Sequence, residues 1–155
     1  MTTLPTLALS ALIFLSPLVE QAQSNPIVGK WSIEFAAGMR IENDAPTVLM
    51  AKGTLTIETS GDSLVATLHV EPNAEIQARP DSRFTTPMTT GTVIFEQHSQ
   101  ARMNSNGEET LVPAVTIWTL DVTGDTIAGT LSRRIEGMEL PVVGPQPVKG
   151  TRIKG

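Results

Sequence analysis

Residues 47–71 read TVLMAKGTLTIETSGDSLVATLHVE, and this stretch indicates the fold class. Within 49–57 every second residue is apolar or small, and the residues between them are mostly polar. A period of two is typical of a β-strand with one face toward a core and one toward water. Ser60-Gly61-Asp62 interrupts the pattern, which resumes over 64–68. The stretch therefore predicts a β-hairpin whose two strands share an inward face.

The same alternation recurs along the rest of the chain. Residues 31–35 carry Trp, Ile and Phe at every second position, and residues 118–122 carry Trp, Leu and Val in the same way. Residues 72–87 combine prolines with mixed polarity, which predicts a long loop with at most one short strand. The predicted strands are 28–35, 39–43, 47–59, 63–71, 91–103, 109–122, 126–136 and 147–154.

A short internal similarity supports repeated hairpins. Residues 58–68 (ETSGDSLVATL) resemble residues 121–131 (DVTGDTIAGTL), and either a repeated unit or two independent choices of good turn residues explains the match. A further turn is predicted at Asn106-Gly107, since both residues tolerate positive φ values. Because closure removes the exposed edges of an antiparallel sheet, we expect an all-β, antiparallel closed barrel of about eight strands. Such a barrel is filled by side chains or holds one small ligand.

The N-terminal segment has the pattern of a secretory signal peptide. Residues 4–19 form an apolar run, which predicts an apolar helix, and Ala22-Gln23-Ser24 then offers a small-x-small cleavage site. We therefore expect residues 1–24 to be a signal peptide and residues 25–155 to form the barrel domain, which would be periplasmic or secreted. The alternatives are a retained membrane anchor, although about 20 apolar residues are needed to span a bilayer, and a cytosolic helix.

Composition excludes several classes of function. The 155 residues carry a net charge of −5 with no basic stripe, which argues against nucleic-acid binding. The chain has no cysteine, so disulfides, thiol catalysis, cysteine-based zinc sites and a lipid-modified cysteine are all excluded. No motif calls for a cofactor.

Gly29-Lys30-Trp31 opens the first predicted strand with the G-x-W pattern of lipocalin-like (calycin-type) barrels. The chain also resembles small secreted bacterial barrels of poorly defined role, which share this opening and repeated Gly-Asp hairpins. In the lipocalin-like barrels the Trp packs across the closed end and an Arg from the last strand lies over it. The resemblance thus implies structural roles for Gly29, Trp31 and Arg152.

Catalytic and metal-binding patterns are weak in this sequence. Glu96 and His98 share a strand face, but a metal site needs three or four converging ligands and the sequence offers no third. His69 is expected to point to water. Asp62 and Asp125 are best explained as turn residues that cap their own backbone. No G-x-S-x-G elbow is present. We therefore expect a protein that is not an enzyme, with a hydrolase or isomerase as the remaining alternative.

Arg133 departs from the apolar pattern of its strand. Counting by twos from Ile127 places Arg133 on the inward face, where an unpaired cation is costly. It needs an acidic neighbour, a position at the barrel mouth or an anionic ligand; a bulge that turns it outward or a partner such as Glu136 would also explain it. If the barrel is hollow, the expected ligand-binding residues are Phe35, Met39, Leu55, Phe95, Trp118, Leu131 and Arg133.

The expected function is binding of a small apolar or amphipathic molecule, either neutral or anionic, in the bacterial envelope. The small inward residues Ala51, Gly53, Ala66 and Gly129 suggest space in the interior, although they also let bulky neighbours interdigitate. The rival hypothesis is a structural or interaction module with a filled interior, which docks onto a larger envelope or membrane protein complex.

Overall fold

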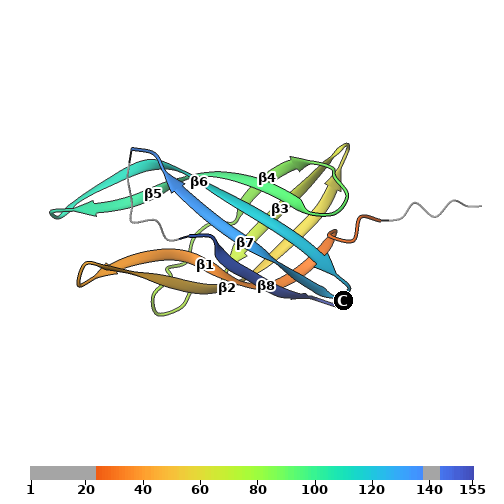
Figure 1. Ribbon diagram of the computed structural model, residues 1–155, viewed down its shortest axis with the longest axis horizontal. Coiled ribbons are helices and arrows are strands. Elements are labelled where there is room, and N and C mark those ends of the chain that lie inside the picture. The colour runs from red at the N-terminus through yellow and green to blue at the C-terminus, as the bar shows by residue number, and fades with distance from the viewer. Residues whose placement is uncertain (1–23, 138–143) are drawn as a thin grey trace, which may run out of the picture.

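Eight antiparallel strands form a nearly closed barrel in the computed structural model, which describes residues 24–137 and 144–155 (Figure 1). The strands lie in the order β4-β3-β2-β1-β8-β7-β6-β5, so each hydrogen-bonds to its neighbours. The all-β class and the strand number expected from the sequence are thus confirmed. The bounds are β1 Gly29–Glu42, β2 Ala45–Ser60, β3 Ser63–Val70, β4 Ser82–Pro87, β5 Val93–Ser105, β6 Glu108–Thr123, β7 Thr126–Ile135 and β8 Gln146–Arg152.

Two different contacts close the sheet on itself. The first and last strands pair from Trp31↔Arg152 to Glu34↔Lys149, which joins the two ends of the chain's barrel domain. β4 and β5 stand at the two ends of the strand order, and here side chains meet instead of backbones. The Phe84 and Phe95 rings pack edge to face with centroids 5.4 Å apart. The barrel is therefore nearly closed, with an apolar seam between β4 and β5.

The number of strands agrees with the prediction, but two of the predicted strands form one strand and another strand lies in the predicted loop. Segments 28–35 and 39–43 belong to one strand, β1, because a bulge between Ala36 and Gly38 lets the chain continue through the apparent break. The eighth strand is β4, which lies in the segment predicted mainly as a loop. Its prolines do not prevent pairing, because β4 is the end strand of the order and Pro87 is its last residue.

Tight turns connect most neighbouring strands, as predicted. Gly61 (φ 58°) and Gly124 (φ 60°) each take the first place of a two-residue loop and are followed by an Asp without positive φ, as in a type II′ turn. Asn106 and Gly107 both have positive φ, as in a type I′ turn. Asn43-Asp44 forms a further primed turn, with φ values of 51° and 60°.

The β1–β2 and β5–β6 hairpins extend beyond the rest of the sheet at the same end of the barrel (Figure 1). β5 and β6 pair from Val93↔Leu120 to Ser105↔Glu108, whereas the β6–β7 pairing reaches only Ala114↔Ile135. We call this end the open end. The opposite end carries the β2–β3 and β6–β7 turns, the start of β1 and the end of β8, and we call it the closed end.

Residues 1–23, which hold most of the predicted signal peptide, lie outside the described residues. The leader and the domain boundary at residue 25 therefore stay predictions. In the two described ranges, no helix has the length and apolar character that crossing a membrane requires.

Candidate ligand-binding site

The closed end is built around Trp31, whose side chain is fully buried. Its indole Nε1 donates a hydrogen bond of 2.9 Å to the Ile27 carbonyl. The Arg152 guanidinium lies over the indole ring, 4.1 Å from its centroid. Arg152 also donates to the carbonyls of Val28 (2.8 Å) and Pro26 (2.6 Å), so it ties the incoming chain across the barrel end. This geometry matches the arrangement that the G-x-W resemblance implied.

Gly29 makes that arrangement possible. Its φ of 143° is one that side chains rarely adopt, and a Cβ at this position would overlap the guanidinium of Arg152. On the far side of Arg152, the Asp125 carboxylate lies 3.4 Å from its Nε and 2.8 Å from Nζ of Lys154. The closed end is therefore sealed by an aromatic ring, a cation and a turn carboxylate.

Packed side chains occupy the middle of the barrel. Phe35 and Trp118 meet with ring centroids 5.3 Å apart, and Phe84 stacks on Trp118 at 5.9 Å. Of the predicted lining residues, five are buried: Phe35, Leu55, Phe95, Trp118 and Leu131. They contribute to one continuous core. The structure thus brings them together as core, and a ligand would have to lie beyond them, toward the open end.

Small inward residues do not mark free space at the two glycines. A Cβ at Gly53 would overlap the carbonyl oxygen of His69 on β3, and one at Gly129 would overlap that of Thr119 on β6. Glycine is needed at these positions because a neighbouring backbone comes too close for any side chain. Gly53 and Gly129 therefore allow close strand approach instead of lining a cavity.

The bulge in β1 moves Met39 away from the predicted inward face. Gly38 pairs with Leu49, which packs partly buried against the core, and Met39 pairs with Val48. Successive residues of a strand face opposite sides, so Met39 and Val48 lie on the face opposite Leu49. Counting by twos along β1 gave the wrong side, because the extra residue at Ala37 shifts the alternation.

Arg133 lies on the inward side of β7, near the open end. It pairs with Thr116, which is buried, and the β6–β7 pairing runs without a bulge. Between described residues Arg133 makes no ion pair, so the pairing with Glu136 considered from the sequence is not formed. Arg133 is an exposed residue, although partial desolvation by the surrounding protein lowers the pKa of its guanidinium. Arg133 is thus a cation at the barrel mouth.

Sequence reasoning did not consider a second arginine, Arg79. Arg79 lies in the β3–β4 connection, residues 71–81, which the sequence predicted mainly as a loop. Arg79 is an exposed residue, and partial desolvation lowers the pKa of its guanidinium, as does the positive charge of Arg133. An Arg in a loop has no strand alternation to indicate its direction, so no sequence signal could have placed it.

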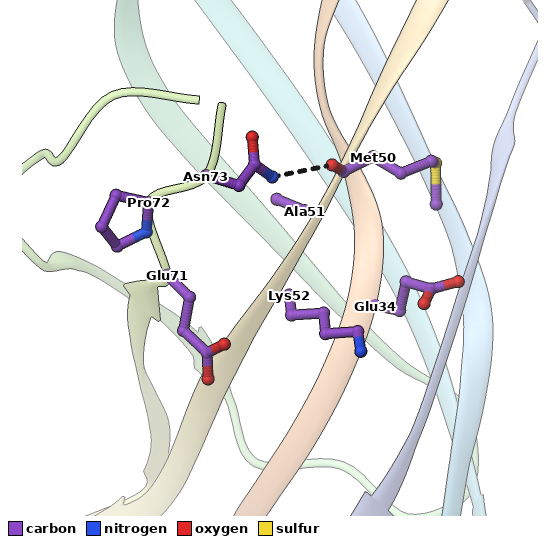
Figure 2. A pocket seen from close by; sticks show the side chains of 7 residues that line it. All are labelled: Glu34, Met50, Ala51, Lys52, Glu71, Pro72 and Asn73. Carbon is purple, nitrogen blue, oxygen red and sulfur yellow. Dashed lines mark hydrogen bonds between the residues drawn. The ribbon is translucent and has the colours of Figure 1, made fainter. Parts of the chain in front are cut away.

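An open pocket of about 350 Å³ lies elsewhere, where the β1–β2 sheet meets the start of the β3–β4 connection (Figure 2). None of the predicted ligand-binding residues lines it. Asn73 spans one side and donates a hydrogen bond to the Met50 carbonyl. The residues that line the pocket are Glu34, Met50, Ala51, Lys52, Glu71, Pro72 and Asn73. Three of its seven lining residues are charged, Glu34, Lys52 and Glu71, whereas the site expected from the sequence has one cation among apolar walls.

The two histidines form exposed pairs with carboxylates. His69 points outward, as predicted, and its Nδ1 lies 2.7 Å from Asp81. His98 lies 3.1 Å from Glu96, so the predicted shared face is confirmed. No group of three or more His, Asp or Glu side chains within the described ranges could hold a metal ion.

No known protein family, curated protein or solved structure matches this chain. The sequence and the geometry are therefore the only support for the fold, a nearly closed eight-stranded barrel that is compatible with ligand binding.

Proposed function

We propose that this chain is a non-enzymatic barrel of the periplasm or cell exterior, which binds a small, largely apolar acid at its open end. An eight-stranded barrel has the size for one small ligand. The pairing of Trp31 with Arg152 after G-x-W supports a calycin-like type of barrel. The apolar leader and the Ala22-Gln23-Ser24 site support export.

The observation that carries the proposal is the position of Arg133. Its neighbours on the inward face of β7 are Leu131, which is buried, and Ile135, which is half-buried. Across the strand pair lies Thr116, and Arg133 makes no ion pair with a carboxylate among the described residues. A cation among apolar groups, partly shielded from water, forms a stronger charge-assisted hydrogen bond with a carboxylate than it would in bulk water. This combination suits an alkyl acid.

Titration of a purified chain with octanoate and its methyl ester tests the proposal. Arg133→Ala should weaken octanoate binding by about tenfold or more, since a hydrogen bond to a charged group contributes about 1.5–3 kcal/mol. Binding of the ester should change little. Arg134→Ala is the matched control, because Arg134 pairs with Val115 on the outer face of the same strand. Calorimetry measures both affinities.

Two results would contradict the proposal. If octanoate does not bind saturably to the wild-type chain, the proposal is wrong. If the Arg133 and Arg134 variants lose octanoate affinity equally, the effect is only one of overall charge. Export is tested separately by the intact mass of protein purified from its own host. We expect a mature chain beginning at or near Asn25; a chain that keeps residues 1–24 would contradict export with cleavage.

The alternative function is an interaction module in a larger envelope complex. The packed interior favours it, as do exposed apolar side chains near the tips of the two projecting hairpins: Ile41 is 56% exposed and Leu111 is 58% exposed. Exposed apolar side chains are common singly but suggest an interface when two projecting elements carry them. If this function is correct, the I41S/L111S variant should keep its melting temperature and lose a partner that co-purifies from the host.

A further inference from the structure

The β3–β4 connection, residues 71–81, meets the barrel core through a single side chain. Ile76 is 8% exposed and belongs to the hydrophobic core, whereas the other residues of the connection are all exposed. The β2–β3 turn lies at the closed end, so β3 ends and the connection begins toward the open end (Figure 1). Ile76 therefore covers the core from the open end, as Trp31 covers it from the closed end.

A local turn, and not strand pairing, presents Ile76 to the core. The Glu71 N–H donates to the Lys52 carbonyl (2.9 Å), which extends the β2–β3 pairing by one residue. Beyond this bond, the backbone of the connection bonds only to itself within the described ranges, from the Asn73 N–H to the Ile76 carbonyl (2.9 Å). The Asn73 Oδ1 accepts from the N–H groups of Glu75 and Ile76 (both 2.8 Å). The turn is therefore independent of the barrel's hydrogen-bond ladder.

The ion pairs that tie the connection to the barrel are exposed. The Arg40 guanidinium on β1 lies 3.3 Å from Glu75, and Nδ1 of His69 on β3 lies 2.7 Å from Asp81. All four side chains are about half-exposed, and exposed ion pairs contribute little to stability. A segment with few buried apolar contacts opens locally at a lower cost than the strands do. The main cost of opening this connection is thus the exposure of Ile76.

We propose that Ile76 occupies the subsite of the ligand's alkyl tail, and that the ligand binds by displacing Ile76 from the core and opening the connection. This inference rests on the proposed function and names where the tail lies. The closed end is sealed by Trp31 and Arg152, so a tail that enters from the open end meets the core where Ile76 covers it. Both groups are aliphatic, so the tail replaces the buried contacts that Ile76 gives up.

Calorimetry of octanoate and methyl octanoate with the wild-type chain and with Ile76→Ala tests this inference. Binding to the wild-type chain has to expose Ile76, which lowers the apparent affinity, and the variant avoids most of that cost. Ile76→Ala should therefore bind both compounds about tenfold or more tightly than the wild type does. Ile76→Val should show a smaller gain in the same direction, and melting curves check that both variants fold.

Ile57→Ala is the matched control. Ile57 is fully buried at the closed end, where it pairs with Gly29, and the substitution removes the same atoms as Ile76→Ala does. It should lower the melting temperature, because it leaves a cavity. Its affinity for octanoate should stay within about threefold of wild type, since distant sites act independently.

Amide hydrogen exchange followed by mass spectrometry measures the displacement directly. Saturating octanoate should speed exchange over residues 74–78, because the displaced connection loses the bonds from Asn73, while exchange in the strands slows. Equal octanoate affinity in the wild type and Ile76→Ala, or exchange over 74–78 that stays unchanged or slows, would overturn this inference. The proposed function would then stand if octanoate binding depends on Arg133. No saturable binding of octanoate to either chain would overturn both.

Discussion

Trp31 shows at the scale of one residue how the closed end holds together. The ring is fully buried, its Nε1 is bonded to Ile27, and Arg152 covers its face. Each of these contacts depends on the same side chain, so its removal leaves a large cavity and an unsupported cation. Guanidinium groups stack well on aromatic faces, which explains why Arg, and not Lys, suits the last strand here.

Trp31→Ala should therefore lower the free energy of unfolding by about 3–5 kcal/mol, the usual loss when a large aromatic site is emptied. Urea denaturation followed by circular dichroism measures the change. Lys30→Ala is the control, because Lys30 is exposed on the same strand and should change stability by less than about 0.5 kcal/mol. A near-neutral Trp31 variant would mean that the closed end does not stabilise the barrel.

At the scale of the element, close approach of neighbouring strands decides where β7 needs glycine. Gly129 pairs with Leu120, and the Thr119 carbonyl occupies the place of its missing Cβ. The obstructing atom belongs to backbone, so it cannot rotate away as a side chain could. β7 can keep its course through this point only with glycine.

Gly129→Ala should destabilise the barrel by about 1–3 kcal/mol, the usual cost of forcing extra atoms into a packed interior. The neighbouring Ala128 is exposed on the opposite face, so Ala128→Ser should change stability by less than about 0.5 kcal/mol. Thermal melting of the two variants tests the difference. If Gly129→Ala melts at the wild-type temperature, the two strands do not approach as closely as described.

At the scale of the whole molecule, closure joins segments that lie far apart in the chain. Asp125, in the β6–β7 turn, contacts both Arg152 and Lys154 beside the start of β1. The hydrogen bond from Lys154, then its charge and that of Arg152, hold the pKa of Asp125 below its ordinary value of 3.8. A carboxyl whose pKa is lower in the folded state stabilises that state only while it is ionised.

This contribution is therefore present above pH 3.8 and is lost as the pH falls through the lower folded-state pKa. Asp125→Asn should lower the melting temperature near neutral pH, and the gap to wild type should close in acid. Asp62→Asn is the matched control, because Asp62 follows Gly61 in the equivalent turn but makes no ion pair within the described ranges. A gap that does not vary with pH would contradict the ionic role of Asp125.

The sequence by itself determined the strand class, most turns and the inward faces of β2, β3, β6 and β7, whereas the Trp31–Arg152 pair was expected from the G-x-W resemblance. Alternation and turn chemistry are local properties, so they can be read without knowing what lies across the barrel. Arg133 was found in this way, because its inward position follows from its own strand.

Only the tertiary structure decided the rest of the candidate site. The bulge after Ala36 reversed the side of Met39, since one extra residue in a strand shifts every later side chain to the other face. Predicted lining residues such as Trp118 and Phe95 are part of the packed core, because Phe84 contacts both rings from a strand that the sequence pattern did not reveal. The path of the β3–β4 connection is fixed by long-range contacts that no local pattern indicates, such as the hydrogen bond from the Glu71 N–H to the Lys52 carbonyl.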